Sequence, residues 1–571
     1  MLISNISSWL CLLTWASFLS LAVGQKVKHP EIDLGYEIHQ GTVNETGQYY
    51  IFSNIPYADQ PLGELRFREP RAIDVASNMT NNGTIDVICP QAYPQWVINL
   101  IAEREGVDPE IIGNMLNNQP GQTEACLVLD VYVPIDVFNR VPTNGPTAPV
   151  LVWIHGGGFT FGHKKLFGNP AGLIARSQFN GHDGVVVVSI NYRLGMFGFL
   201  GSDIMPNIGL LDQKHALDWV QAYIPIFGGN NNRTTVMGES AGAASIVHHI
   251  TAYDEGYPAP FQQAIPLSPG FQINVDQVEV YDAVLKKASE LSGKEIEDIK
   301  GAKDLREWPF EQLRNINQAV STEAIYGTFG FGPTPDGRYI RDLPQAMLYY
   351  SNIDLGIKML ISHTSNESIP FLPPDITTND DVRAWAARTF SEATLETLGT
   401  LLGDDHLYPA IGAGDPRLAY PYATEYERAA LLASHVNFAC TTRFLAKARG
   451  NDTYNYVFAY PPGWHAGDVP YVFFNGDTAT PDNGLPVDPA LAYQLQDYII
   501  SFVKLGNPNP GHESAVVPPR EFPVYGADAK VLQLTYDGWT EGTDSLVGHR
   551  CDWIQKAIVE GRLGGERGGS T

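Results

Sequence analysis

A short segment around Ser240 constrains the fold of this chain more than any other feature. The motif Gly238-Glu239-Ser240-Ala241-Gly242 follows the apolar, β-branched run 234–237 and precedes the small-residue run 243–247. The first run is typical of a buried strand and the second of a helix start. A serine on a sharp strand-to-helix turn has an exposed hydroxyl, and the flanking glycines let the chain turn without a Cβ clash. The context therefore predicts a nucleophilic serine, although the five residues alone would equally fit a glycine-rich turn with a solvated serine.

Buried strands alternate with helical segments along most of the chain. Continuous apolar runs predict strands at 150–154, 185–192, 264–268, 356–361 and 454–460. Helical periodicity is clearest at 211–224, 429–448 and 491–505. This order predicts an α/β fold with a large, mostly parallel central sheet flanked by helices. Because no linker divides it, we expect one domain over 25–557 and a disordered, glycine-rich tail over 558–571.

The N-terminal residues predict a secreted protein. An apolar stretch from Trp9 to Val23 ends in small residues, which predicts a signal peptide over 1–24 and cleavage before Gln25. The stretch has no Lys or Arg before it, and it is shorter than the ~18–20 apolar residues of a membrane span. With 63 acidic and 37 basic residues, the formal net charge is -26. We therefore expect neither nucleic-acid partners nor stable membrane insertion.

Cysteines and glycosylation sequons agree with an extracellular location. Cys11 falls in the expected signal peptide, and an even number remains, namely Cys89, Cys126, Cys440 and Cys551. An even number in an oxidising compartment predicts disulfides. Three pairings are possible; proximity in sequence favours Cys89–Cys126 and leaves Cys440–Cys551. N-x-[ST] sequons predict glycosylation at Asn44, Asn78, Asn82, Asn232 and Asn451.

Two later residues have the order expected for partners of Ser240. A serine nucleophile needs a base to take its proton and a carboxylate to orient that base. Glu367 comes shortly after the strand that ends at 361, and His465 comes shortly after the strand that ends at 460. Either residue alone would be interpreted as solvated or structural. Their positions at strand ends, in the order serine, acid, histidine, predict a catalytic triad.

Three consecutive glycines, Gly156 to Gly158, follow the strand predicted at 150–154. Such a run frees backbone N–H groups to point at a ligand, although a merely flexible loop is the alternative. An oxyanion formed by attack on a carbonyl needs donors of this kind. We therefore expect Gly157, Gly158 and the N–H of Ala241 to form an oxyanion hole, and His155 to brace the loop.

These motifs, taken with others, resemble the type-B carboxylesterase/lipase family, which includes the cholinesterases. The residues that carry the resemblance are His155-Gly156-Gly157-Gly158-Phe159, Gly238-Glu239-Ser240-Ala241-Gly242-Ala243, Glu124-Ala125-Cys126-Leu127, Asn191-Tyr192-Arg193-Leu194-Gly195, Gly209-Leu210-Leu211-Asp212-Gln213 and His465-Ala466-Gly467-Asp468-Val469-Pro470-Tyr471-Val472-Phe473. The resemblance spans roughly Gly41 to Trp553, and the late Arg550-Cys551-Asp552 looks most like secreted fungal members.

The resemblance implies several features of fold and site. It implies an α/β-hydrolase fold, the triad Ser240, Glu367 and His465, and a Cys89–Cys126 disulfide. It also implies a buried ion pair between Arg66 and Glu124. Substrate contacts are expected from Phe159 of the glycine motif and from Phe329 and Phe331, which fall where the family has acyl-pocket residues. Phe329 and Phe331 would suit a plain core equally well.

Three positions depart from the family pattern. Ala125 replaces the usual Asp of Glu-Asp-Cys-Leu, Asn230 replaces the usual Asp after Phe-Gly-Gly, and Ser368 replaces the usual Gly after the acid. The last change affects the geometry of the loop around Glu367 more than its carboxylate. We also expect Asn366, which begins a further sequon, to be buried beside the triad and unglycosylated. An aromatic cation site between Cys89 and Cys126 is not evident, which disfavours choline esters.

The sequence thus predicts a secreted serine carboxylic-ester hydrolase that acts on a small-molecule ester through an acyl-enzyme, without a metal or organic cofactor. Within this class, a lipase is one variant, which a lid between Cys89 and Cys126 would suit; an ordinary packed loop is equally consistent with that segment. An ester hydrolase or acyl-transfer enzyme of secondary metabolism is another. A non-catalytic binding module of the same fold is disfavoured because all three triad positions are filled.

Overall fold

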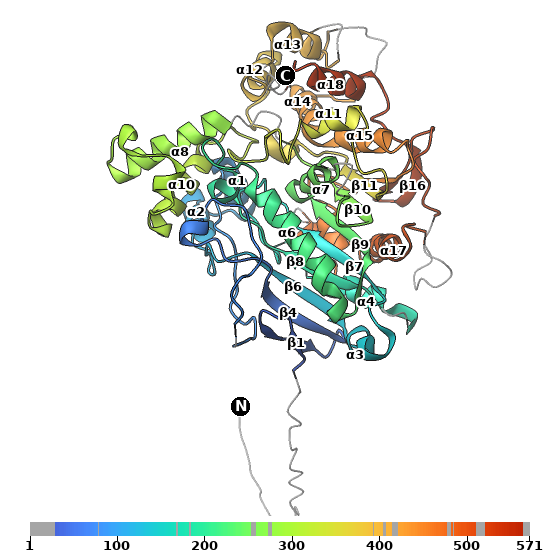
Figure 1. Cartoon of the computed structure of the whole chain (residues 1–571). Helices are drawn as coiled ribbons and strands as arrows, with labels where there is room; N and C mark the ends of the chain where they lie inside the picture. The colour runs from blue at the N-terminus through green and yellow to red at the C-terminus, as the bar shows by residue number, and fades with distance from the viewer. Residues whose placement is uncertain are drawn as a thin grey trace, which may run out of the picture.

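The centre of the molecule is an 11-stranded mixed sheet (Figure 1). The computed structural model describes residues 29–77, 79–166, 169–181, 184–252, 258–271, 277–391, 393–403, 407–413, 421–476, 481–482, 485–509 and 520–563. In spatial order the strands are β16 (Gly538–Thr543), β15 (Lys530–Thr535), β12 (Tyr454–Phe458), β11 (Lys358–Thr364), β10 (Gln263–Leu267), β9 (Gly229–Glu239), β7 (Ala148–Ile154), β8 (Val186–Ile190), β6 (Val128–Pro134), β4 (Tyr49–Pro56) and β3 (Thr42–Asn44).

Most of this sheet is parallel. Neighbouring strands from β8 to β15 pair in parallel. Antiparallel pairs occur only at the two edges of the described sheet, among β3, β4, β6 and β8 on one side and between β15 and β16 on the other. The large, mostly parallel sheet predicted from the sequence is therefore confirmed.

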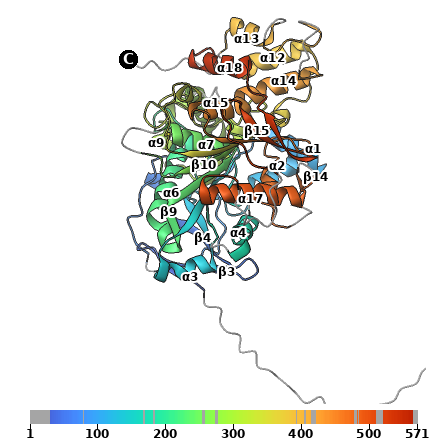
Figure 2. The same ribbon diagram turned by 90° about the vertical axis from the view of Figure 1, so that its right-hand side faces the viewer.

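The central strands are buried on both faces. In β7, Val152 belongs to the larger hydrophobic core, whereas its neighbour Trp153 belongs to a second core on the opposite face. Successive side chains of a strand point to opposite faces, so both must be apolar, which explains the continuous apolar run. Helices cover both faces (Figures 1 and 2): α6 (Ile208–Tyr223) and α7 (Ala241–Thr251) on the first, and α4 (Ala171–Ser177) and α17 (Pro489–Leu505) on the second.

Further helices form a layer over the end of the sheet at which β9 leads into α7. In Figure 1 they lie above and to the left of the sheet. They are α1 (Gln95–Glu105), α2 (Pro109–Asn117), α8 (Gln277–Ser292), α10 (Phe310–Thr322), α12 (Asn379–Thr389), α13 (Leu395–Leu402), α14 (Glu425–Ser434), α15 (Cys440–Ala448) and α18 (His549–Val559). The shorter elements are β1 (Glu31–Asp33), β2 (Ile38–Gln40), β5 (Thr80–Asn81), α3 (Ile135–Asn144), α5 (Gly195–Phe199), α9 (Ala302–Leu305), α11 (Pro344–Tyr349), α16 (Val469–Val472), β13 (Pro481–Asp482) and β14 (Leu485–Pro486).

The helix predicted over 429–448 contains a wider turn. A π-helical segment, His435–Ala439, separates α14 from α15. The carbonyl of Asn437 accepts a hydrogen bond from the N–H of Phe271 at 2.8 Å, outside the helix. In the wider turn this carbonyl does not bond within the helix, so the N–H of Phe271 satisfies it instead. Single π-helical turns of this kind are frequent at functional sites.

Covalent and ionic links predicted from the sequence are present. The Cα atoms of Cys89 and Cys126 are 5.0 Å apart, and those of Cys440 and Cys551 are 5.3 Å apart, each pair joined by a disulfide. This confirms the pairing that proximity in sequence favours. The buried guanidinium of Arg66 makes two parallel bonds to Glu124, with Nε–Oε1 at 2.5 Å and Nη2–Oε2 at 2.6 Å.

Ordered structure extends past the expected end of the domain. Ile558, in α18, and Leu563, after it, are fully buried in the larger core. The boundary predicted at 557 is therefore too early, because apolar side chains of the last helix and the following turn complete the core. The rest of the expected tail and the expected signal peptide lie outside the described residues. Among the described helices, none is long and apolar enough to cross a membrane.

Most of the predicted glycosylation sites lie on the surface. The side chains of Asn82 and Asn232 are exposed, and those of Asn44 and Asn451 are partly exposed. Asn78 lies outside the described residues. Exposure is a requirement for glycosylation, so these four positions remain predicted sites.

Candidate active site

Ser240 occupies a sharp turn between β9 and α7. Its backbone has φ 55° and ψ -120°, a conformation that non-glycine residues rarely adopt and that is held only where the surroundings enforce it. A Cβ on Gly242 would lie 2.1 Å from the carbonyl oxygen of Ile154, so only glycine lets the turn approach the end of β7 this closely. The strand-to-helix turn predicted from the motif is therefore present.

The structure brings Glu367 and His465 together. Glu367 follows β11 and is fully buried, and its Oε2 lies 2.5 Å from Nδ1 of His465. The other carboxylate oxygen, Oε1, accepts a hydrogen bond from the N–H of Thr364 at 2.6 Å. Burial opposes ionisation, but His465 and these hydrogen bonds outweigh it and lower the pKa of Glu367. A negative charge is therefore held against one imidazole nitrogen.

A second carboxylate faces the other imidazole nitrogen. Glu239, which precedes Ser240, is buried, and its Oε1 lies 3.0 Å from Nε2 of His465. Both Ser240 and His465 belong to the described residues, and no hydrogen bond joins the serine hydroxyl to the imidazole. Burial alone would lower the pKa of His465, but the two flanking carboxylates outweigh it and raise the pKa. The pKa of Glu239 is itself raised by burial.

A third acidic side chain, Asp468, completes this buried group. Its Oδ2 accepts hydrogen bonds from the hydroxyls of Tyr456 at 2.7 Å and Ser362 at 3.3 Å. Burial, together with repulsion from Glu239 and Glu367, raises the pKa of Asp468 to about 7. Sequence reasoning did not single out this residue for a role. Its position three residues after His465, in one of the motifs that carry the resemblance to a known family, was the available signal.

The glycine loop is held in conformations that other residues would not tolerate. Gly157 has φ 105° and Gly158 has φ 61°. A Cβ on Gly157 would lie 2.1 Å from the carbonyl oxygen of Phe161, and one on Gly158 would lie 2.2 Å from the ring of Phe329. His155 stacks on Tyr192 with ring centroids 4.5 Å apart, and the Tyr192 hydroxyl donates to the His155 carbonyl at 2.9 Å. These contacts support the prediction that His155 braces the loop.

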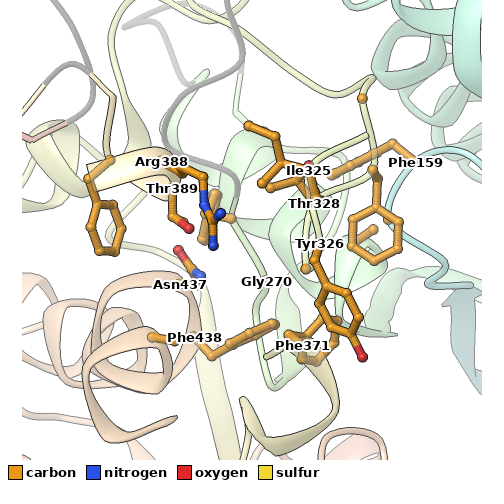
Figure 3. Close-up of a pocket in the computed structure, with 18 of the residues that line it drawn as sticks. Phe159, Gly270, Ile325, Tyr326, Thr328, Phe371, Arg388, Thr389, Asn437 and Phe438 are labelled. Carbon is orange, nitrogen blue, oxygen red and sulfur yellow. The ribbon is translucent and has the colours of Figure 1, made fainter. Parts of the chain in front are cut away.

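A cavity of about 170 Å³ has Ser240 in its lining, and Figure 3 shows other residues that line it. Gly158 and Ala241 line it at the serine end. Much of its wall is aromatic, formed by Phe159, Phe271, Tyr326, Phe329, Phe371 and Phe438. Phe371 and Phe438 also pack against the imidazole of His465, with ring centroids 5.2 and 4.5 Å away. Polar side chains of Arg388, Thr389, Ser391 and Asn437 also line the cavity, together with the aromatic Trp385 and Phe390.

The three phenylalanines expected to contact substrate occupy different positions. Phe159 and Phe329 line the cavity. Phe331 is fully buried in the larger core and is not among the described residues that line this cavity. The surroundings of Phe331 are therefore those of an ordinary core residue, which was the alternative interpretation of the sequence.

The segment between Cys89 and Cys126 is packed against one wall of the cavity. Trp96, in α1, donates from its indole nitrogen to the carbonyl of Thr328 at 2.7 Å. Its ring lies 5.4 Å from those of Phe329 and Phe371. In contrast, Ile111 and Met115 on α2 are 60% and 59% exposed. The first helix therefore packs behind the wall, against Phe329 and Phe371, whereas the second presents apolar side chains to solvent.

Asn366 differs from its expected environment. Its side chain is exposed, although the adjacent Glu367 is fully buried. Neighbouring residues in a turn point in different directions, so burial of one does not imply burial of the next. The side-chain amide of Asn366 donates to the carbonyl of Pro462 at 2.8 Å. The prediction that this sequon is buried is wrong.

Known proteins share both sequence and fold with this chain. Residues 36–548 match the model of the Carboxylesterase family. The chain is 36% identical to Carboxylesterase patB of Aspergillus clavatus, over 96% of this chain and 99% of that protein. It is 27% identical to Lipase 2 of Geotrichum candidum, over 86% of this chain and 91% of the lipase. The solved structure of Aspergillus niger EstA matches with a TM-score of 0.74 at 23% identity, over 94% of this chain and 99% of that one, which supports the fold alone.

Proposed function

Because this chain belongs to the carboxylesterase family and is a carboxylic-ester hydrolase, we propose that Ser240, His465 and Glu367 are its catalytic triad. The observation that carries the proposal is the 2.5 Å contact between Glu367 and His465, in a site that also holds the strained turn at Ser240. A buried carboxylate on Nδ1 fixes the tautomer of the imidazole, so that Nε2 is the nitrogen that takes the serine proton.

In the first half of the reaction, the Ser240 hydroxyl attacks the ester carbonyl while Nε2 of His465 takes its proton. The negative charge that develops on the carbonyl oxygen is stabilised by the N–H groups of Gly157, Gly158 and Ala241. When the tetrahedral intermediate collapses, His465 returns the proton to the departing alkoxide. This step leaves an acyl group on Ser240 and releases the alcohol.

In the second half, water takes the place of the alcohol. His465 accepts a proton from the water as the oxygen attacks the acyl carbonyl, and the same N–H groups hold the second oxyanion. Collapse of this intermediate returns the proton from His465 to Ser240 and releases the carboxylic acid.

Nε2 of His465 must turn from Glu239 to Ser240 for this chemistry. In the free protein the Nε2–Glu239 distance is 3.0 Å. Catalytic hydrogen bonds are often long or misaligned before substrate binds and tighten in the complex. We infer that substrate entry, which displaces solvent around Ser240, brings the serine hydroxyl and the imidazole together.

The cavity favours a small ester over a long-chain lipid. Its volume of about 170 Å³ and its aromatic wall suit a compact acyl or alcohol group. A lipase is the second candidate, because Ile111 and Met115 expose apolar surface on α2 and Lipase 2 is a relative. A rate on tributyrin that rises sharply above its solubility limit would favour the lipase, whereas a rate that saturates below that limit would favour the esterase.

We also propose that the protein is secreted and glycosylated. The support is the apolar segment up to Val23, the two disulfides and the surface positions of the sequons at Asn44, Asn82, Asn232 and Asn451. Expression in a fungal host should place the protein in the medium, with a mass that falls on treatment with an N-glycosidase. Retention in the cytosol at the mass of the bare chain would contradict this.

Covalent labelling tests the proposed triad. A fluorophosphonate probe should label the wild-type protein and fail to label Ser240→Ala. The matched control is Ser292→Ala, at the exposed end of α8. Labelling should persist in that variant. A folded wild-type protein that never reacts would overturn the proposal.

A further inference from the structure

A cationic side chain, that of Arg388, is part of the lining of the cavity. Arg388 lies in the last turn of α12 and lines the same cavity as Ser240. Figure 3 shows the guanidinium of Arg388 and the side-chain amide of Asn437 pointing toward one another, across the cavity from Phe159 and Tyr326. The π-helical segment presents Asn437 here. Polar groups from two separate helices therefore meet at one place on the wall.

Among the described residues, Arg388 has no hydrogen bond or ion pair. Within the described ranges, each of the other arginines has a hydrogen bond, an ion pair or another interaction, whereas Arg388 makes none. Arg383 on the same helix, for comparison, donates to the carbonyl of Leu402 at 3.2 Å. The five donors of the Arg388 guanidinium are left to solvent or to a ligand in the cavity.

A cationic side chain in the cavity contrasts with the acidic character of the whole chain. The protein has 63 acidic and 37 basic residues, so most of its surface repels anions. Glu279 also lines the cavity, and no ion pair joins it to Arg388 among the described residues. An anionic group brought beside Arg388 would meet a positive charge that no carboxylate of the described residues neutralises. A guanidinium binds a carboxylate through two parallel hydrogen bonds, which gives both energy and orientation.

We propose that Arg388, with Asn437, binds a free carboxylate on the substrate, so that the preferred esters carry a carboxylate in addition to the scissile ester. The inference rests on the proposed esterase function, because it assumes that the ester carbonyl lies at Ser240. Both residues line one cavity of about 170 Å³, so we expect a short chain between the ester and the carboxylate. The carboxylate belongs either to the acyl part or to the alcohol part of the ester. The experiment below tests each possibility with its own pair of esters.

The alternative role for Arg388 is structural. A cation in the last turn of a helix interacts favourably with the negative end of the helix dipole. That role predicts a small loss of thermal stability on substitution and no change in the choice between charged and neutral esters. Substrate preference therefore distinguishes the two roles.

The experiment compares isosteric esters on the full-length protein. For the acyl side, monoethyl adipate is compared with ethyl hexanoate, in which a methyl group replaces the carboxylate. For the alcohol side, 4-acetoxybutanoate is compared with butyl acetate. We expect the wild-type enzyme to prefer the charged ester in one arm, mainly through a lower KM. Arg388→Gln should lower the ratio of the two kcat/KM values roughly tenfold to hundredfold. Arg388→Glu should lower it further.

The matched control is Arg383→Gln, which removes an arginine from the same helix and should leave the ratio at its wild-type value. A wild-type enzyme that hydrolyses neutral esters without preferring the charged ester in either arm overturns this inference alone. An Arg388→Gln ratio equal to that of wild type does so as well. A protein that neither hydrolyses any of the four esters nor reacts with the fluorophosphonate probe overturns the proposed function together with the inference.

Discussion

The base of the cavity and its walls are built differently. Ser240, Glu367 and His465 follow β9, β11 and β12, and these strands are fixed by the hydrogen bonds of one sheet. The walls come from widely separated segments: Trp96 behind Phe329, Arg388 on α12, and Asn437 and Phe438 on the π-helical segment. Side-chain packing and loops hold these together. We therefore expect changes at the base to affect the chemistry, and changes in the walls to affect substrate choice and stability.

The largest expected effect is at the base. His465→Ala should lower kcat/KM by about five orders of magnitude, because it removes the general base. Because the imidazole lies between two buried carboxylates and against two phenylalanine rings, thermal unfolding of the variant is measured alongside its activity. Steady-state hydrolysis of p-nitrophenyl butyrate measures the loss, and His549→Ala, at the exposed start of α18, is the control. A loss below tenfold would mean that another group acts as the base.

The glycine loop provides the next test. Gly158→Ala should lower kcat on the order of 10²–10³-fold, the cost of losing an oxyanion donor. The added Cβ would lie 2.2 Å from the ring of Phe329, so the loop must move. Gly145→Ala is the matched control, because Gly145 also has positive φ, 68°, but a Cβ there has nothing within 4 Å. Equal effects of the two substitutions on kcat would show that backbone strain alone is responsible.

The second carboxylate at the base should set the pH range of activity. The base form of His465 exists only above its pKa, so activity is lost as pH falls through that value. Glu239 helps to raise this pKa. Glu239→Gln should therefore move the acidic limb of the kcat/KM profile to lower pH, by about one unit or more. An acidic limb that stays in place or moves to higher pH would contradict the role assigned to Glu239.

The smallest expected effect on activity is in the wall. Trp96→Ala removes the bond to Thr328 and the contacts with Phe329 and Phe371. We expect the free energy of unfolding to fall by about 3–5 kcal/mol. On activity, we expect kcat/KM for small esters to change less than about tenfold, mostly in KM. Denaturant unfolding and steady-state kinetics measure both. A large loss of kcat would show that the wall takes part in the chemistry, contrary to the expectation that only the base does.

The same division explains which features could be predicted from the sequence. The turn at Ser240 and the order of Glu367 and His465 were accessible because each adjoins a buried strand with a recognisable apolar run. The disulfides and the Arg66–Glu124 pair followed from spacing and from the family resemblance. These features are encoded within a few neighbouring residues or in a small number of pairings.

Features that depend on long-range packing were not predicted. Arg388 and Asn437 lie on helices whose faces are fixed only when the layer above the sheet is assembled. The π-helical turn has no marked signature in its residues, and its position depends on a bond from Phe271. Asp468 was visible in a motif, but its proximity to Glu239 and Glu367 is a property of the folded sheet. The exposure of Asn366 was missed because a loop can turn one residue inward and its neighbour outward.

The disulfide between Cys440 and Cys551 links the end of the chain to the proposed catalytic base. Cys440 begins α15, two residues after Phe438, whose ring lies against His465, and Cys551 lies in α18. The last helix is therefore covalently attached to the segment whose Phe438 packs against the imidazole. A protein that is truncated before α18, or purified under strong reductant, should show altered kinetics at a site that the cut itself does not reach. For expression, a removable tag is accordingly safer than any shortening of the C-terminus.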